Sequence, residues 1–153
     1  MKIIKWILIS LAAIALILFL AFQWMKSNTK KMSPEGTVNY QFEQYDVSIF
    51  YNRPSVRGRT IFGELVPYDK VWRTGANEAT TFTTKTDLEI GGKVLPAGEY
   101  SLWTVPGEQE WKFIWNSEIP GWGVNWDAEA NINHQFDVLS TTVYKETIPD
   151  IIE

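Results

Sequence analysis

Four arginines lie within one segment of this 153-residue chain, residues 53–80. They are Arg53, Arg57, Arg59 and Arg73. A guanidinium group is planar, always charged and carries a fork of N–H donors that matches a carboxylate or a phosphate. The segment therefore predicts an anion clamp. The alternative is structural: the same arginines pair with Glu64, Asp69, Glu78 and backbone carbonyls and so hold an irregular loop in place.

The end of this segment, WRTGANE at residues 72–78, combines an aromatic face, a cation, an amide and a carboxylate. Trp72 offers a stacking surface, Arg73, Asn77 and Glu78 offer hydrogen bonds, and Gly75 allows close backbone approach. This combination suits a sugar or a polar metabolite. An ion pair between Arg73 and Glu78 that anchors a turn would have the same sequence, so both interpretations stay open.

Two carboxylates suggest a catalytic alternative, in which Glu78 and Asp69 act as paired acid and base of a hydrolase or lyase. The arginines would then polarise the substrate. Such a mechanism requires a cleft and one carboxyl group with a raised pKa.

His134 is the only histidine of the chain, and no GxSxG motif accompanies it. A serine triad would need this histidine, so we expect His134 to be a surface or strand-start residue. Asp127, Glu129 and Asp137 have a loose spacing for metal ligation. We therefore predict no metal site and no cofactor.

The chain contains eight tryptophans, and they fall into two kinds of context. Trp111 and Trp115 alternate with Phe113, which is typical of a strand face that packs in a core. Trp122 and Trp126 lie among glycines and polar residues, which favours an exposed stacking platform.

The elements that would position these residues are strands joined by Gly/Pro turns. Period-two alternation and β-branched residues predict strands at residues 37–43, 45–52, 79–86, 88–90, 93–95, 98–105, 110–116 and 135–145. Gly91 and Gly92 form the two-residue turn of a hairpin, because both turn positions tolerate positive φ. The pattern predicts an all-β fold, an antiparallel β-sandwich or flattened barrel.

The N-terminal residues form a membrane span rather than part of a core. Residues 6–22 are apolar except for Ser10, and the distance from Trp6 to Trp24 in a helix is about 27 Å, close to the roughly 30 Å hydrocarbon thickness. No small-x-small cleavage site follows, which favours an uncleaved anchor over a signal peptide. We predict a transmembrane anchor at residues 1–26, a juxtamembrane linker at 27–36 and a β domain at 37–153.

The charge of the β domain excludes some partners. Residues 32–153 hold nine Lys+Arg against 18 Asp+Glu, a net charge of about −9. This argues against nucleic acid and anionic membrane surfaces as partners. The chain has no cysteine, which excludes disulfides and a lipid-modified lipoprotein.

The VWRTGANEAT block, the GGK hairpin and the AGEYSLW strand together resemble the bacterial family of domain of unknown function 2911 (DUF2911), over about residues 46–143. The resemblance implies an exported protein and brings no established substrate, cofactor or catalytic residue. It also implies further strands beyond the position of Glu153. We therefore expect either a fragment or a sheet edge that pairs with another chain.

These inferences combine into a single-pass protein of the cytoplasmic membrane, anchored through residues 6–24, with its domain facing the periplasm or exterior. The favoured function is a non-catalytic binding or envelope-associated module for an anionic or carbohydrate ligand. The alternatives are the hydrolase or lyase and a structural interaction domain completed by a partner strand. The predicted ligand-binding residues are Arg53, Arg57, Arg59, Trp72, Arg73, Asn77 and Glu78.

Overall fold

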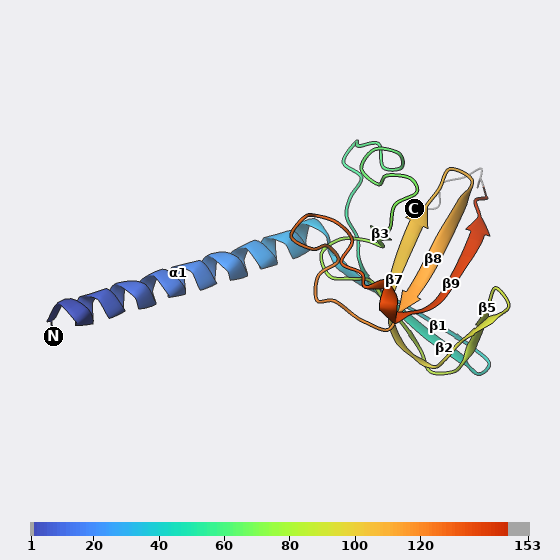
Figure 1. The fold of residues 1–153 in the computed structure, drawn as a ribbon, viewed down its shortest axis with the longest axis horizontal. Helices are drawn as coiled ribbons and strands as arrows, with labels where there is room; N and C mark the ends of the chain where they lie inside the picture. The colour runs from blue at the N-terminus through green and yellow to red at the C-terminus, as the bar shows by residue number, and fades with distance from the viewer. Residues whose placement is uncertain (1, 147–153) are drawn as a thin grey trace.

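A computed structural model describes residues 2–146, so residue 1 and residues 147–153 of the predicted anchor and β domain lie outside the described residues. The chain forms one long N-terminal helix, α1 (Lys2–Met32), followed by an antiparallel β-sheet domain (Figure 1). The predicted all-β fold with a preceding helix is confirmed.

Helix α1 stands apart from the β domain along its apolar length (Figure 1). Its side chains from Ile3 to Asn28 are exposed, and the most apolar stretch is not buried by the domain at all. The stretch Ile3–Met32 is long and apolar enough to cross a membrane, although a signal sequence near an N-terminus has the same properties. The helix is therefore not a core helix of a soluble domain.

Only Ser33 and Pro34 separate α1 from the first strand, which differs from the linker predicted at residues 27–36. Residues 27–32 contain no glycine or proline and remain helical. Lys30 and Lys31 lie in the last turn, where positive charges interact favourably with the helix dipole. The helix ends before Pro34 because a proline disfavours the helical conformation of the preceding residue. The domain is therefore attached to α1 by a very short connection.

The main sheet has seven antiparallel strands in the order β1-β2-β4-β7-β8-β9, with β3 paired beside β7. The strands are β1 (Glu35–Phe42), β2 (Tyr45–Asn52), β3 (Trp72–Arg73), β4 (Thr81–Thr84), β7 (Gly98–Pro106), β8 (Glu110–Asn116) and β9 (Asp137–Tyr144). Among residues 2–146, β1 and β9 are the outermost strands. Pairing of a sheet edge with another chain stays a prediction.

A second, two-stranded sheet consists of β5 (Leu88–Ile90) and β6 (Lys93–Leu95). Its turn is formed by Gly91 and Gly92 with φ of 59° and 73°, which confirms the predicted hairpin. The hairpin covers one face of the main sheet. The core on this face consists of Phe82, Leu95, Tyr100, Leu102, Trp115 and Leu139.

The opposite face of the sheet has its own core of Ala79, Trp103 and Ile114. Leu102 and Trp103 belong to different cores because successive side chains of a strand point to opposite faces. This second face is covered by irregular segments that contribute Val71, Ala130 and Ile132. The layers over the main sheet are thus a small hairpin on one face and loops on the other.

The aromatic stripe of β8 lies on the hairpin side, as predicted. Trp115 is buried in that core, Phe113 packs against it, and Trp111 is half-buried farther along the strand. Neighbouring rings along the stripe lie 6.3 and 6.4 Å apart between centroids.

Replacing Leu95 by alanine should lower the free energy of unfolding by about 2–5 kcal/mol, because a completely buried leucine would leave a cavity under the hairpin. The matched control is Val94→Ala on the same strand, where the side chain is 62% exposed and the cost should stay below about 1 kcal/mol. Thermal unfolding of the full chain in a mild detergent measures both. Equal costs would mean that the hairpin is not packed on the sheet.

Candidate functional site

A cavity of about 550 Å³ lies between the irregular segment 53–66, the segment 72–77 and one end of β7 and β8. We call it the arginine cavity. Three arginines line it, Arg57, Arg59 and Arg73. Its other lining residues are Thr29, Met32, Ser33, Pro54, Ser55, Val56, Ile61, Phe62, Leu65, Val66, Trp72, Thr74, Gly75, Ala76, Asn77, Thr104, Pro106 and Trp111.

The walls of the arginine cavity are largely apolar and aromatic. Phe62 meets Trp111 of β8 edge-on, with ring centroids 5.1 Å apart and planes at 70°. Trp72 of β3 pairs with Thr104 of β7 and therefore points to the same side of the sheet. An aromatic wall of this kind favours a ligand with a flat or apolar body.

The segment that carries Phe62 folds back on itself. The Val66 N–H donates to the Ile61 carbonyl at 2.8 Å, and the Gly63 N–H donates to the Val66 carbonyl at 2.9 Å. This segment is irregular but internally bonded, so it can hold Phe62 and Leu65 in place although both are about half exposed.

Two of the four arginines bond to backbone carbonyls. Arg53 Nη2 donates to the Glu35 carbonyl at 3.2 Å, and Arg53 does not line the cavity. Arg59 donates from Nε to the Val56 carbonyl at 3.0 Å and from Nη2 to the Ser55 carbonyl at 2.8 Å. The structural alternative is therefore right about backbone carbonyls, and Arg53 stabilises the junction of β1 and β2 rather than the cavity.

None of the ion pairs within residues 2–146 involves an arginine. The pairs are Lys30–Glu35, Lys30–Glu78, Lys85–Asp46 and His134–Asp137. The predicted pairing of the arginines with Glu64, Asp69 and Glu78 is wrong in the described structure. The cavity is thus lined by three arginines, Arg57, Arg59 and Arg73. No carboxylate within residues 2–146 forms an ion pair with any of them.

The WRTGANE turn connects β3 to β4 and depends on Gly75. Gly75 has a φ of 118°, and a Cβ on it would lie 2.9 Å from the Asn52 carbonyl oxygen. The turn is closed by a hydrogen bond from the Thr80 hydroxyl to the Thr74 carbonyl. Asn77 also has a positive φ, 56°, which asparagine tolerates better than most residues.

Four buried polar atoms without a hydrogen-bond partner occur in and beside this turn: Asn52 Oδ1, Arg73 Nε, Thr74 Oγ1 and Asn77 Nδ2. A buried polar atom without a partner costs about 1–3 kcal/mol. Three of these atoms belong to residues that line the arginine cavity. Burial also lowers the pKa of the Arg73 guanidinium. Internal hydrogen bonding in this turn is therefore incomplete among the described residues.

Glu78 points away from Arg73 and toward the end of α1. Its carboxylate lies 3.2 Å from Lys30 Nζ and accepts a hydrogen bond from Asn52 Nδ2 at 3.3 Å. The alternative of an Arg73–Glu78 ion pair is therefore wrong, because Lys30 takes the place of the arginine. Glu78 joins the turn to α1, and it is not among the lining residues of the cavity.

The surroundings of Glu78 keep it ionised. Desolvation by itself would raise the pKa of the Glu78 carboxyl, but the hydrogen bond from its own backbone and the hydrogen bond and charge of Lys30 outweigh desolvation and lower the pKa. A general acid needs the opposite shift. Asp69 does not line the cavity and lies at the end of β7, where its N–H donates to the Pro106 carbonyl at 2.8 Å. The two carboxylates thus share no partner in the described structure.

Residues 118–133 form a long loop that backs the turn from the other side. The Gly123 N–H donates to the Asn77 carbonyl at 2.8 Å, and a Cβ on Gly123 would lie 2.8 Å from Arg73 Cδ. Glycine is therefore required for the loop to approach the arginine stem. The loop holds Arg73 in place without itself lining the cavity.

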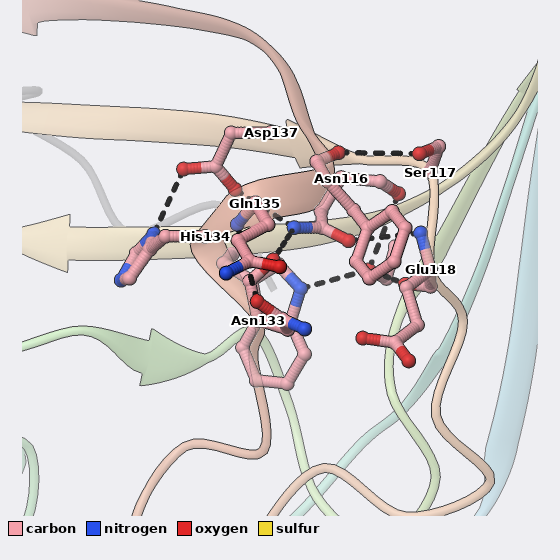
Figure 2. A network of polar contacts seen from close by, with 10 residues as sticks. Asn116, Ser117, Glu118, Asn133, His134, Gln135 and Asp137 are labelled. Carbon is pink, nitrogen blue, oxygen red and sulfur yellow. Dashed lines mark hydrogen bonds and ion pairs between the residues drawn. The ribbon is translucent and has the colours of Figure 1, made fainter.

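A polar network closes both ends of this loop (Figure 2). Asn116 Nδ2 donates to the Asn133 carbonyl and to Asp137 Oδ1, both at 2.8 Å, and Asn116 Oδ1 accepts from the Glu118 N–H at 2.8 Å. His134 Nδ1 lies 2.8 Å from Asp137 Oδ2. His134 is exposed, as expected, but it lies in a short 3-10 helix, η1 (His134–Phe136), just before β9, and its role in this network is structural.

The two tryptophans of this loop differ in exposure. Trp126 is fully exposed, whereas Trp122 is half-buried, so the two do not form one exposed platform. Among the described residues, no group of three His, Asp or Glu side chains is arranged to hold a metal ion.

Of the seven predicted ligand residues, the structure brings five to the cavity: Arg57, Arg59, Trp72, Arg73 and Asn77. Sequence reasoning missed Phe62, Trp111 and the end of α1. The apolar IFG of residues 61–63 beside the arginines was a signal for Phe62. Nothing in the local sequence connects residues 29–33 with a turn more than 40 positions away.

A comparison with models of protein families gave a match. A family model with the description "Protein of unknown function (DUF2911)" matches residues 33–153. Neither the curated proteins nor the solved structures gave a match.

Replacing Gly75 by alanine should destabilise the domain by more than the about 1–2 kcal/mol that a positive φ costs an L-residue, because the new Cβ would collide with the Asn52 carbonyl. Gly58→Ala is the matched control: Gly58 has a φ of 67°, but nothing lies within 4 Å of a Cβ there. Thermal unfolding of both variants measures the difference. If the two variants lose the same stability, the close packing of the turn on Asn52 is wrong.

Glu78→Gln should lower stability at neutral pH and have little effect in acid. The folded-state pKa of Glu78 lies below its ordinary value of 4.5, so its stabilising contribution is complete above that pH and is lost as the pH falls through the lowered value. Unfolding of both proteins across this pH range tests the expectation. Glu89→Gln on β5, outside the described ion pairs, is the control. A pH-independent difference for Glu78→Gln would contradict the Lys30 contact.

Proposed function

We propose that this chain, which belongs to the DUF2911 family of proteins of unknown function, is a non-catalytic binding module. Its ligand would combine an anionic group with an apolar or aromatic body. The arginine cavity is the proposed binding site. The proposal is for a membrane-anchored, envelope-associated protein, with α1 as its anchor and its domain outside the cytoplasmic membrane.

The observation that carries this proposal is the set of arginines without carboxylate partners. The domain carries about twice as many acidic as basic residues, yet no described ion pair uses an arginine and three arginines line one cavity. Hydrogen bonds to charged groups contribute about 1.5–3 kcal/mol each. A carboxylate or phosphate between these guanidinium groups would gain such bonds.

The volume and lining of the cavity support an apolar or aromatic body as the second part of the ligand. Its volume of about 550 Å³ is within the usual range of about 300–1,000 Å³ for small-molecule sites. Phe62, Trp72 and Trp111 provide the aromatic wall.

The chemistry of the lining supports binding rather than turnover. The charged side chains that line the described cavity are arginines, which are always protonated and cannot act as a general base at neutral pH. Glu78, the carboxylate nearest in sequence to the turn, is bonded to Lys30 and Asn52. The hydrolase or lyase alternative would need another base.

Arg57→Ala should weaken binding of the anionic ligand while leaving the fold intact. Arg57 is exposed, lines the cavity and makes no described hydrogen bond or ion pair, so its removal breaks no internal contact. The measurement is thermal unfolding of the full chain with a panel of phosphates, aromatic carboxylates and neutral oligosaccharides. A ligand at 100 times its Kd adds about 2.7 kcal/mol and should raise Tm by several degrees.

Lys112→Ala on β8 is the charge-matched control, since Lys112 is exposed and does not line the cavity. It should keep the full ligand shift. A shift that Arg57→Ala retains and Lys112→Ala loses would contradict the proposed site. A shift with neutral oligosaccharides alone would replace the anionic ligand by a carbohydrate.

A further inference from the structure

The arginine cavity is partly built by the helix that precedes the domain. Thr29 and Met32 of α1, with Ser33 just after it, are lining residues. Ser33 is buried, and its N–H donates to the Thr29 carbonyl at 3.0 Å. Lys30 contacts both Glu35 of β1 and Glu78 of the WRTGANE turn. These contacts fix the position of the cavity relative to the axis of α1.

The length of α1 places this side of the cavity at the level of lipid headgroups. If Trp24 lies at the boundary of the hydrocarbon, Thr29 is five residues farther on, about 8 Å along the helix axis. The headgroup layer of one leaflet is about 5 to 8 Å thick. With only Ser33 and Pro34 between helix and sheet, the domain cannot move far from the bilayer.

Positive charge surrounds the same end of the helix. A shallow depression beside it is lined by Lys26, Lys30 and Lys31, and the arginine cavity adds Arg57 and Arg59. A lysine or arginine near an anionic bilayer surface contributes about 1 kcal/mol. The net negative charge of the whole domain predicts no attraction to an anionic bilayer surface. These cations, however, lie together at the end of the domain that is attached to α1.

An exposed aromatic residue lies in the loop behind the WRTGANE turn. Residues 118–133, orange in Figure 1, approach this turn, since the Gly123 N–H donates to the carbonyl of Asn77, a residue of the cavity. Trp126 of this loop is fully exposed. Tryptophan favours the interface between water and lipid.

The apolar part of the cavity lining suits a hydrocarbon chain. Met32, Val56, Phe62 and Leu65 line it and are all exposed by 42% or more. An apolar wall open to the outside beside cations fits a molecule with an anionic head and a lipid tail better than a fully water-soluble anion.

We infer that the arginine cavity takes the phosphorylated headgroup of an anionic membrane lipid, from the leaflet next to which α1 holds the domain. This inference rests on the proposed function and adds the source of the ligand. Arg57 and Arg59 would bind the phosphate, and Met32 and Leu65 would contact the first part of the lipid tail.

The test is thermal unfolding of the full chain in a neutral detergent with three probes. These are phosphatidylglycerol, phosphatidylcholine and water-soluble glycerol phosphate. Phosphatidylglycerol should raise Tm at the lowest concentration, glycerol phosphate only at a concentration at least about tenfold higher, and phosphatidylcholine not at all, since tenfold in Kd corresponds to about 1.4 kcal/mol of tail contacts.

Four variants separate the parts of the inference. Arg57→Ala should lose the response to both phosphates, and Lys112→Ala should keep it. Leu65→Asn, a change of similar volume at a 42% exposed position, should lose the preference for lipid over glycerol phosphate and keep the response to glycerol phosphate. The double variant Lys26→Ala/Lys31→Ala should keep a response to phosphatidylglycerol in the detergent.

Each contrary result has a distinct meaning. Equal responses to phosphatidylglycerol and glycerol phosphate, both dependent on Arg57, would overturn the lipid source and leave the binding function standing. A lipid response that needs Lys26 and Lys31 but not Arg57 would mean attraction to the helix surface and would overturn the inference. Absence of any response to either phosphate overturns the inference, and the wider ligand panel then decides the binding function.

Discussion

The buried side of β7 around Trp103 is the constraint on which the rest of the structure depends. Trp103 is completely buried, and its Nε1 donates to Ser101 Oγ at 2.8 Å, which in turn donates to the Glu118 carbonyl at 2.6 Å. Trp103 also pairs with Arg73 in the ladder of β3 and β7. One residue thus connects the WRTGANE turn, through its backbone, with the start of the 118–133 loop, through its side chain.

Irregular backbone around this point is held by glycines and by polar side chains rather than by sheet pairing. Gly75 approaches Asn52, and Gly123 approaches Arg73, both at distances that exclude a Cβ. The Asn116 network then closes the loop that carries Gly123 (Figure 2). A site made of such segments can place polar atoms where a regular strand could not, and some of them remain without internal partners.

The distribution of charge in the domain also depends on contacts between distant segments. Acidic residues make the domain as a whole negative, but Lys30 uses two of them, Glu35 and Glu78, to attach α1. Two carboxylates are therefore engaged by a lysine, and within residues 2–146 the cavity arginines Arg57, Arg59 and Arg73 form no ion pair. Helix attachment and the proposed binding function are connected through Glu78.

The sequence by itself determined the longer strands, the glycine hairpin and the apolar helix, because these follow from local periodicity and turn chemistry. It did not predict the two-residue strand β3, which exists through its pairing with β7. It also pointed to Arg57, Arg59, Trp72, Arg73 and Asn77, since their residue types carry the chemistry wherever the chain places them. Only the tertiary structure decided the partners. That Glu78 bonds to Lys30 and not Arg73, that Arg53 bonds to a strand carbonyl, and that Phe62 meets Trp111 are contacts between distant positions. Long-range packing sets such contacts, and no local pattern encodes them.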